Sequence, residues 1–152
     1  MTRLRPSDER GFTVIELTIV LIMIAILIGI AIPTFLGVRD RGYDTAAKTS
    51  VMLAVRSAIG IGESALFGGV TTDTLNDAEP SLTFVDASSP STSFTVVSQT
   101  VIGDSVFFAA VRSTSGTCFM IRHQDAGSDF AKAAVPTCKA GDHGLMAFGP
   151  SW

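Results

Sequence analysis

The stretch that decides the fold is Arg10–Gly42, RGFTVIELTIVLIMIAILIGIAIPTFLGVRDRG. Between Phe12 and Val38, its only charged side chain is that of Glu16. A carboxylate placed in hydrocarbon without a partner costs at least ~2.5–3.5 kcal/mol on insertion scales. A chain that keeps an acid in such a run usually uses it, so Glu16 is the first candidate functional residue.

The apolar run that follows Glu16 is long enough to cross a bilayer as a helix. Leu17–Val38 has 22 residues and no charge, and such a helix reaches ~33 Å against a hydrocarbon core of ~30 Å. Pro33 removes one backbone donor, so we expect it to kink the helix or melt it locally. The run exceeds the apolar core of about 7–15 residues in a secretory signal. A plain single-pass anchor would explain the length but leaves Glu16 without a role.

This segment resembles the N-terminus of type IV pilins and of their relatives, the pseudopilins of type II secretion systems. The resemblance covers about the first fifth of the chain. It rests on a short charged leader, the Gly11–Phe12 junction, Glu16 five residues after the glycine, and a long apolar helix interrupted by Pro33. In that family a membrane aspartic peptidase cleaves after the glycine and methylates the new terminal amine. The resemblance therefore implies leader cleavage between Gly11 and Phe12 and N-methylation of Phe12.

The resemblance also implies that Glu16 and Phe12 act in subunit assembly. Cleavage creates an ammonium group at Phe12, and in a bundle of parallel helices this group can approach Glu16 of a neighbouring subunit. A buried pair of opposite charges recovers much of the cost that each charge has alone. We therefore expect Glu16 to set the axial register of the subunits.

The implied partners follow from the same resemblance. They are further copies of this chain in a helical filament, the prepilin peptidase, an assembly platform protein and a cytoplasmic motor ATPase. The precursor is expected to be a single-pass protein of the inner (cytoplasmic) membrane, and the product an extracellular filament at the cell surface. The role of the filament stays open between adhesion, twitching motility, DNA uptake and secretion. A pseudopilin of a type II secretion system or a minor pilin, which share this N-terminus, is the first alternative. A non-polymerising, membrane-anchored extracytoplasmic domain is the second.

Beyond the span, the sequence predicts an amphipathic continuation of the helix. Apolar residues recur there at steps of three and four, at Tyr43, Ala47, Val51, Ala54, Ala58, Ile61 and Ala65. We predict an α+β fold in which this long helical spine packs on a small antiparallel sheet of three or four strands, followed by a C-terminal disulfide loop. The expected divisions are a cleaved leader (1–11), a transmembrane or filament-core helix (12–38), its amphipathic continuation (39–67) and the sheet-containing head (68–152).

Residue preferences and turn signals place the elements of the head. Gly103–Asp104 predicts a hairpin turn. Runs rich in β-branched and aromatic residues predict strands at Leu82–Val85, Ser91–Thr100, Val106–Arg112 and Thr117–Arg122. By contrast, Thr71–Pro90 is otherwise expected to be loop, and Asp129–Val135 a helical turn that Pro136 stops.

Cys118 and Cys138 are the two cysteines. An oxidising compartment would permit a disulfide between them, and closing a loop of about 21 residues contributes ~3 kcal/mol in the chain-entropy model. Pilins commonly have a C-terminal disulfide loop, which the resemblance carries to this pair. The alternatives are free thiols, or a zinc-type site completed by His123 and His143, whose spacing from the cysteines matches no common zinc finger.

Other classes of function find little support. The formal net charge of −3 gives no basic platform for nucleic acid, so no specific nucleic-acid partner is predicted. Gly103-Asp104-Ser105 resembles the nucleophile block of some serine esterases, but a triad is recognised by geometry rather than by three letters. The spacing of Asp125, Asp129 and Asp142 fits no EF-hand loop. Because phosphate loops and hydrolase motifs are also missing, we predict no enzyme, no cofactor and no metal ion.

Overall fold

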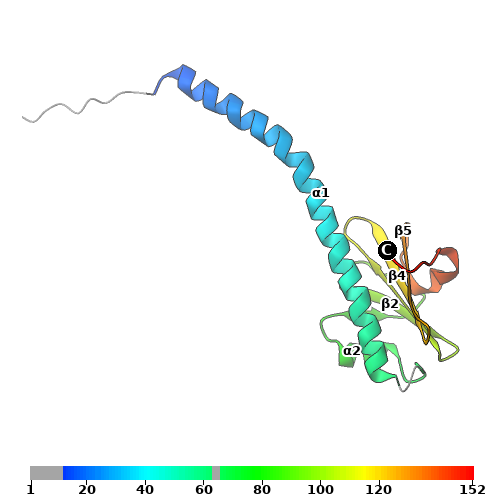
Figure 1. The fold of residues 1–152 in the computed structure, drawn as a ribbon. Coiled ribbons are helices and arrows are strands. Elements are labelled where there is room, and N and C mark those ends of the chain that lie inside the picture. Colours follow the sequence, from blue (N-terminus) through cyan, green and yellow to red (C-terminus); the bar gives the residue numbers. More distant parts are fainter. Residues whose placement is uncertain (1–11, 63–65) are drawn as a thin grey trace, which may run out of the picture. The chain divides into compact units, whose positions relative to one another are not determined.

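The computed structural model describes residues 12–62 and 66–152, which form two units divided between Val38 and Arg39. Helix α1, Val14–Ile61, begins in the first unit and ends in the second (Figure 1). The remaining elements belong to the second unit and are α2 (Thr72–Ala78), β1 (Thr83–Val85), β2 (Val96–Ile102), β3 (Val106–Arg112), β4 (Thr117–Gln124), β5 (Gly127–Ala134) and the 3-10 helix η1 (Ala140–Leu145).

The first unit consists of the apolar half of α1. Every side chain from Phe12 to Val38 is exposed. By length and composition, α1 could cross a membrane. The helix runs through Pro33 without interruption, so the local melting that we considered does not occur, whereas the expected kink at Pro33 stays a prediction.

The second half of α1 packs on the sheet through the stripe predicted from the sequence. Ala47, Ala54 and Ala58 are 0% exposed and belong to one hydrophobic core with residues of β2, β3 and β4. The stripe residue Ala65 lies outside the described residues. The helix ends at Ile61, earlier than the predicted end at residue 67.

The sheet has five strands in the order β1-β2-β3-β4-β5. The predicted antiparallel meander is confirmed for β2, β3 and β4. Strand β5 extends it beyond the three or four strands predicted, with eight residue pairs between β4 and β5. The sheet as a whole is mixed, because β1 pairs with β2 in parallel. The segment 86–95 makes this pairing possible, since it returns the chain from the end of β1 to the start of β2.

The predicted hairpin turn between β2 and β3 is confirmed. Gly103 and Asp104 have φ angles of 59° and 56°. They lie in the three-residue loop between the paired residues Ile102 and Val106, where the chain reverses through the left-handed region. The backbone carbonyl of Asp104 also accepts a hydrogen bond from the backbone N–H of Phe67 at 2.5 Å. The turn therefore ties the segment that follows α1 to the sheet.

Both faces of the central strand β3 are covered. Phe107, Ala109 and Val111 belong to the core shared with α1, while Phe108 and Ala110 belong to a second core shared with Cys118, Cys138 and Ala140. A strand that is buried on both sides reads as a continuous apolar run rather than an alternating one. This arrangement explains the sequence VFFAAV in β3.

Two local predictions were wrong. The predicted helical turn at Asp129–Val135 is instead most of β5, which pairs along the whole of β4. The segment expected to be loop, Thr71–Pro90, contains α2, whose N-cap Thr71 forms a reciprocal capping box with Thr74. In the first segment the strand pairing with β4 decides the structure, and in the second the capping box at the start of α2 does so, because the residue preferences of both segments are weak.

Candidate functional site

The start of α1 holds the predicted assembly residue in a defined geometry. Oε2 of Glu16 accepts hydrogen bonds from the backbone N–H of Thr13 at 3.0 Å and from the Thr13 hydroxyl at 2.8 Å. In return, the backbone N–H of Glu16 lies 3.3 Å from Thr13 Oγ1. The backbone carbonyl of Thr13 accepts the first helical bond, from Leu17.

These contacts form a capping box, with Thr13 at the N-cap and Glu16 at the third helical position. The first backbone N–H groups of a helix have no partner within the helix, and in hydrocarbon each unsatisfied group costs several kcal/mol. The box satisfies two of them and gives the carboxylate partners as well. The sequence contains the signal for this capping box, Thr-x-x-Glu before an apolar run. The interpretation of Glu16 from its charge alone missed it.

The other carboxylate oxygen of Glu16 remains available. Within residues 12–62 and 66–152, Oε1 makes no hydrogen bond, and the Phe12 side chain beside this site is 83% exposed. Gly11, the predicted end of the leader, lies outside the described residues. The expected partner of Glu16 belongs to a neighbouring subunit, so its pairing with Phe12 stays a prediction.

The remaining polar side chains of the apolar run are turned onto their own helix. Thr18 donates its hydroxyl to the Ile15 carbonyl at 2.9 Å. Thr34, next to the proline, donates to the carbonyls of Ala31 at 2.8 Å and Ile30 at 3.3 Å. Within residues 12–38, Glu16 is therefore the one charged side chain, and its Oε1 is the one polar side-chain atom that makes no hydrogen bond.

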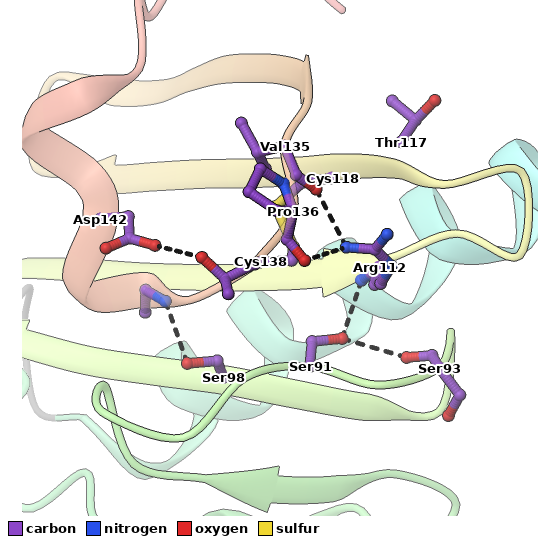
Figure 2. The surroundings of a disulfide bond; sticks show 12 residues. Ser91, Ser93, Ser98, Arg112, Thr117, Cys118, Val135, Pro136, Cys138 and Asp142 are labelled. Atoms are coloured by element: carbon purple, nitrogen blue, oxygen red, sulfur yellow. Dashed lines mark hydrogen bonds between the residues drawn. A yellow bond between two sulfur atoms is a disulfide. The ribbon is translucent and has the colours of Figure 1, made fainter.

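In the head, the disulfide between Cys118 and Cys138 is present, and both residues are almost fully buried (Figure 2). It joins β4 to the segment that follows β5. Arg112 reinforces the link, because its Nη1 donates to the carbonyls of Val135 and Pro136, each at 3.0 Å. The predicted disulfide loop is thus fastened to β3 as well as to β4.

Two buried serines hold the same loop against β2 and the segment before it. Ser91 donates its backbone N–H to the Cys138 carbonyl at 2.8 Å, and its hydroxyl oxygen accepts the N–H of Arg112 at 2.7 Å. Ser98 accepts the backbone N–H of Ala140 at 3.0 Å and donates to the Asp86 carbonyl at 3.2 Å. The disulfide loop is therefore an integral part of the head.

The disulfide takes both cysteines, so the zinc-type alternative is not formed. Nδ1 of His123 pairs with the Ser128 hydroxyl at 2.8 Å, and Nδ1 of His143 with the Ala140 carbonyl at 3.0 Å. Burial lowers the pKa of His123 below its usual value, and the carboxylate of Asp125 partly opposes this shift. The described residues contain no group of three or more His, Cys, Asp or Glu side chains that could hold a metal ion.

Comparison with known proteins gives one match. Residues 6–32 match the family described as the prokaryotic N-terminal methylation motif. Searches of curated proteins and of solved structures found no significant match. The matched residues include the predicted cleavage junction, the Thr13–Glu16 capping box and most of the apolar run. The chain thus carries the prepilin signature of type IV pilins and pseudopilins, and this signature implies a substrate of the prepilin peptidase.

Proposed function

We propose that this protein is a structural pilin subunit that polymerises through the first half of α1 into a type IV pilus on the cell surface. The observation that carries the proposal is the exposed apolar helix from Phe12 to Val38, whose one charged group is Glu16 at the end where the methylation motif lies. A helix of this composition is stable in lipid or in a bundle of like helices, where van der Waals packing replaces contact with lipid.

Assembly begins with leader cleavage between Gly11 and Phe12. The new ammonium group at Phe12, which N-methylation leaves charged, pairs with Glu16 of a neighbouring subunit. Oε1 of Glu16 is free for this contact while Oε2 remains in the capping box. Because a subunit at the wrong height would leave two charges unpaired in an apolar surrounding, the pair sets the axial register.

The proposed partners are those that prepilin processing and filament growth require. The precursor is held in the cytoplasmic membrane, where the prepilin peptidase processes it. An assembly platform and a motor ATPase then move it into the homopolymer, in which a kink at Pro33 adjusts the path of the helix. The heads, including the disulfide loops, form the outer surface of the filament.

The mature N-terminus and the filament test the proposal together. Mass spectrometry of the native protein should give N-methylated Phe12, and electron microscopy should show surface filaments with this chain as the main component. Glu16→Val should insert into the membrane and be cleaved but form no filaments, whereas Asp77→Val, which removes an exposed acid of the head, should form them normally.

The alternatives give different results in these experiments. A pseudopilin or a minor pilin would be cleaved and methylated but would not be the main component of surface filaments. A non-polymerising anchored domain would stay monomeric and respond equally to Glu16→Val and Asp77→Val. Normal filaments from Glu16→Val would overturn the role of Glu16, and a native protein that keeps Met1 would overturn the proposal as a whole.

A further inference from the structure

The outer edge of β5 carries unpaired backbone groups beside one pairing, between Phe130 and Gly149, that the chain itself makes. Phe130 donates its N–H to the Gly149 carbonyl at 2.7 Å and accepts the N–H of Gly149 at 2.9 Å. The backbone groups of Phe130 therefore point away from β4. In an antiparallel pair this direction recurs at every second residue, so the N–H and C=O groups of Lys132 and Ala134 point outward as well.

Lys132 and Ala134 are exposed. To the part of the chain that the structure describes, their outward backbone groups make no hydrogen bond. Unpaired N–H and C=O groups at a sheet edge are a template for another strand. The far edge of the sheet is covered differently, because the side-chain amide of Asn76 bonds to the N–H and C=O of Phe84 in β1 at 2.8 and 3.3 Å.

A groove of about 360 Å³ lies beside the unpaired part of β5, on the face of the sheet that α1 covers. Its ionisable side chains are Lys48 from α1, Lys132 from β5, and Asp44 from α1. Asp44 is already engaged, since its Oδ1 accepts the Ser115 hydroxyl at 2.5 Å. The remaining lining residues are Thr117, Phe119, Ala133 and Ala134.

The ammonium group of Lys48 is held in place by aromatic rings. Its Nζ lies 5.3 Å from the ring centre of Phe119 and 5.9 Å from that of Trp152, within the range of cation–π attraction. Two ammonium groups and one engaged carboxylate give the groove a positive character. An incoming acid would therefore be attracted to the same place where the backbone of β5 is unpaired.

We propose that Lys132–Ala134 and this groove bind an extended, acidic segment of a partner protein, which adds to the sheet as a further strand beside β5. The backbone of the segment would pair with Lys132 and Ala134, and its carboxylate would lie between Lys48 and Lys132. Strand addition to a sheet edge is a common mode of peptide recognition, in which backbone bonds give affinity and side chains give specificity.

The charge at the edge favours a foreign acidic segment over the same strand of a second copy. Two β5 edges paired around Lys132 would bring two ammonium groups side by side, and like charges directly opposite each other destabilise a strand pair. A lysine at an edge also opposes indiscriminate strand pairing. An acidic segment turns the same lysine into an attractive contact.

Peptide binding to the full chain in detergent micelles tests this inference. The first probe is a fluorescently labelled peptide with the sequence Thr-Val-Glu-Val-Thr-Val, and the matched probe has Lys in place of Glu. Fluorescence anisotropy should show at least tenfold tighter binding of the acidic peptide. The affinity should fall with added salt, because the groove is open to solvent.

Three variants separate the backbone contribution from the charge. Lys132→Glu should weaken binding of the acidic peptide at least tenfold, and Lys132→Arg should preserve it. Ala134→Pro removes only an N–H that points away from β4, a change that edge strands tolerate, and should also weaken binding at least tenfold. Circular dichroism and the mass of the unreduced protein verify that each variant is folded.

Lys139→Glu is the control for net charge, because it makes the same charge change outside the groove. Equal losses from Lys132→Glu and Lys139→Glu would show binding by overall charge and overturn the proposal. Full binding by Ala134→Pro would exclude strand addition. Self-association that Ala134→Pro abolishes, without peptide binding, would identify a second copy as the occupant and overturn the acidic partner. None of these measurements requires a filament, so failure here leaves the proposed pilin function untouched.

Discussion

The hydroxyl of Thr13 lies 2.8 Å from Oε2 of Glu16 and thereby couples the start of α1 to its one charged side chain. The bond has two effects. It belongs to a capping box that satisfies the backbone N–H groups of Thr13 and Glu16 at the start of the helix, and it leaves Oε1 of the carboxylate for the proposed contact with another subunit. Thr13 is therefore a positioning residue for Glu16.

The first prediction concerns this bond. Thr13→Val keeps the shape of the side chain but removes the acceptor for the Glu16 N–H and the donor to its carboxylate. Loss of an N-cap side chain costs about 0.5–2 kcal/mol. Amide hydrogen exchange of the mature chain in micelles should show faster exchange at Glu16 in this variant. Thr13→Ser should exchange like the wild type, and equal rates in all three proteins would contradict the role of the capping box.

The second prediction concerns Ser98, which joins η1 to the sheet through a fully buried hydroxyl. Ser98→Ala leaves the N–H of Ala140 and the carbonyl of Asp86 without this partner. Leaving a buried polar group unsatisfied costs about 1–3 kcal/mol, so the free energy of unfolding of the head in urea should fall by that amount. Ser151→Ala, at an exposed position, should leave it unchanged, and an equal effect of both variants would contradict the prediction.

The third prediction concerns pH. Because the pKa of His123 is lower in the folded head than its ordinary value of 6.5, the unfolded chain takes up this proton first as the pH falls. The free energy of unfolding should therefore decrease between about pH 7 and the lowered pKa, and level off below it. His123→Gln should flatten this part of the profile, measured by urea unfolding in steps from pH 7.5 to pH 5. An unchanged slope in the variant would assign the dependence to other groups.

The fourth prediction concerns the disulfide. The double variant Cys118→Ala/Cys138→Ala should lower the free energy of unfolding by ~3 kcal/mol, because the unfolded chain regains the freedom of the closed loop. Thermal unfolding of the full chain in micelles measures the loss, and wild type treated with a phosphine reductant should approach it. A variant as stable as the oxidised wild type would show that the buried serines and Arg112 hold the loop without the covalent bond.

Several parts of the fold could be predicted because they rest on strong local signals. The stripe through Ala47, Ala54 and Ala58 has a clear helical period, and Gly103–Asp104 is a turn sequence in which both residues tolerate positive φ angles. The disulfide came from the small number of cysteines, the compartment and the resemblance. Each of these signals lies within a short stretch of sequence or concerns the only two cysteines, so it does not depend on knowing which distant segments meet.

The missed parts depend on partners distant in sequence. The segment 127–134, GSDFAKAA, has the alanines of a helix, and it is a strand because β4 offers eight register positions and Gly149 pairs with Phe130. The parallel pairing of β1 with β2 likewise produces no repeating pattern of apolar residues from which it could be predicted. The candidate site is the local exception. The charge of Glu16 predicts its importance, whereas its hydrogen bonds to Thr13 depend on the helix beginning at Val14, and the apolar run does not mark that start.

The threonines of the apolar run have a consequence for movement between environments. Because Thr18 and Thr34 bond to their own helix, they present methyl groups outward in lipid and would do so equally among other helices. The proposed departure of the helix from the bilayer would therefore break neither of these hydrogen bonds. The hydrogen-bond energy of these side chains would be nearly the same in lipid and in a bundle of helices. The fit between neighbouring helices and the carboxylate of Glu16 would then decide which environment the helix occupies.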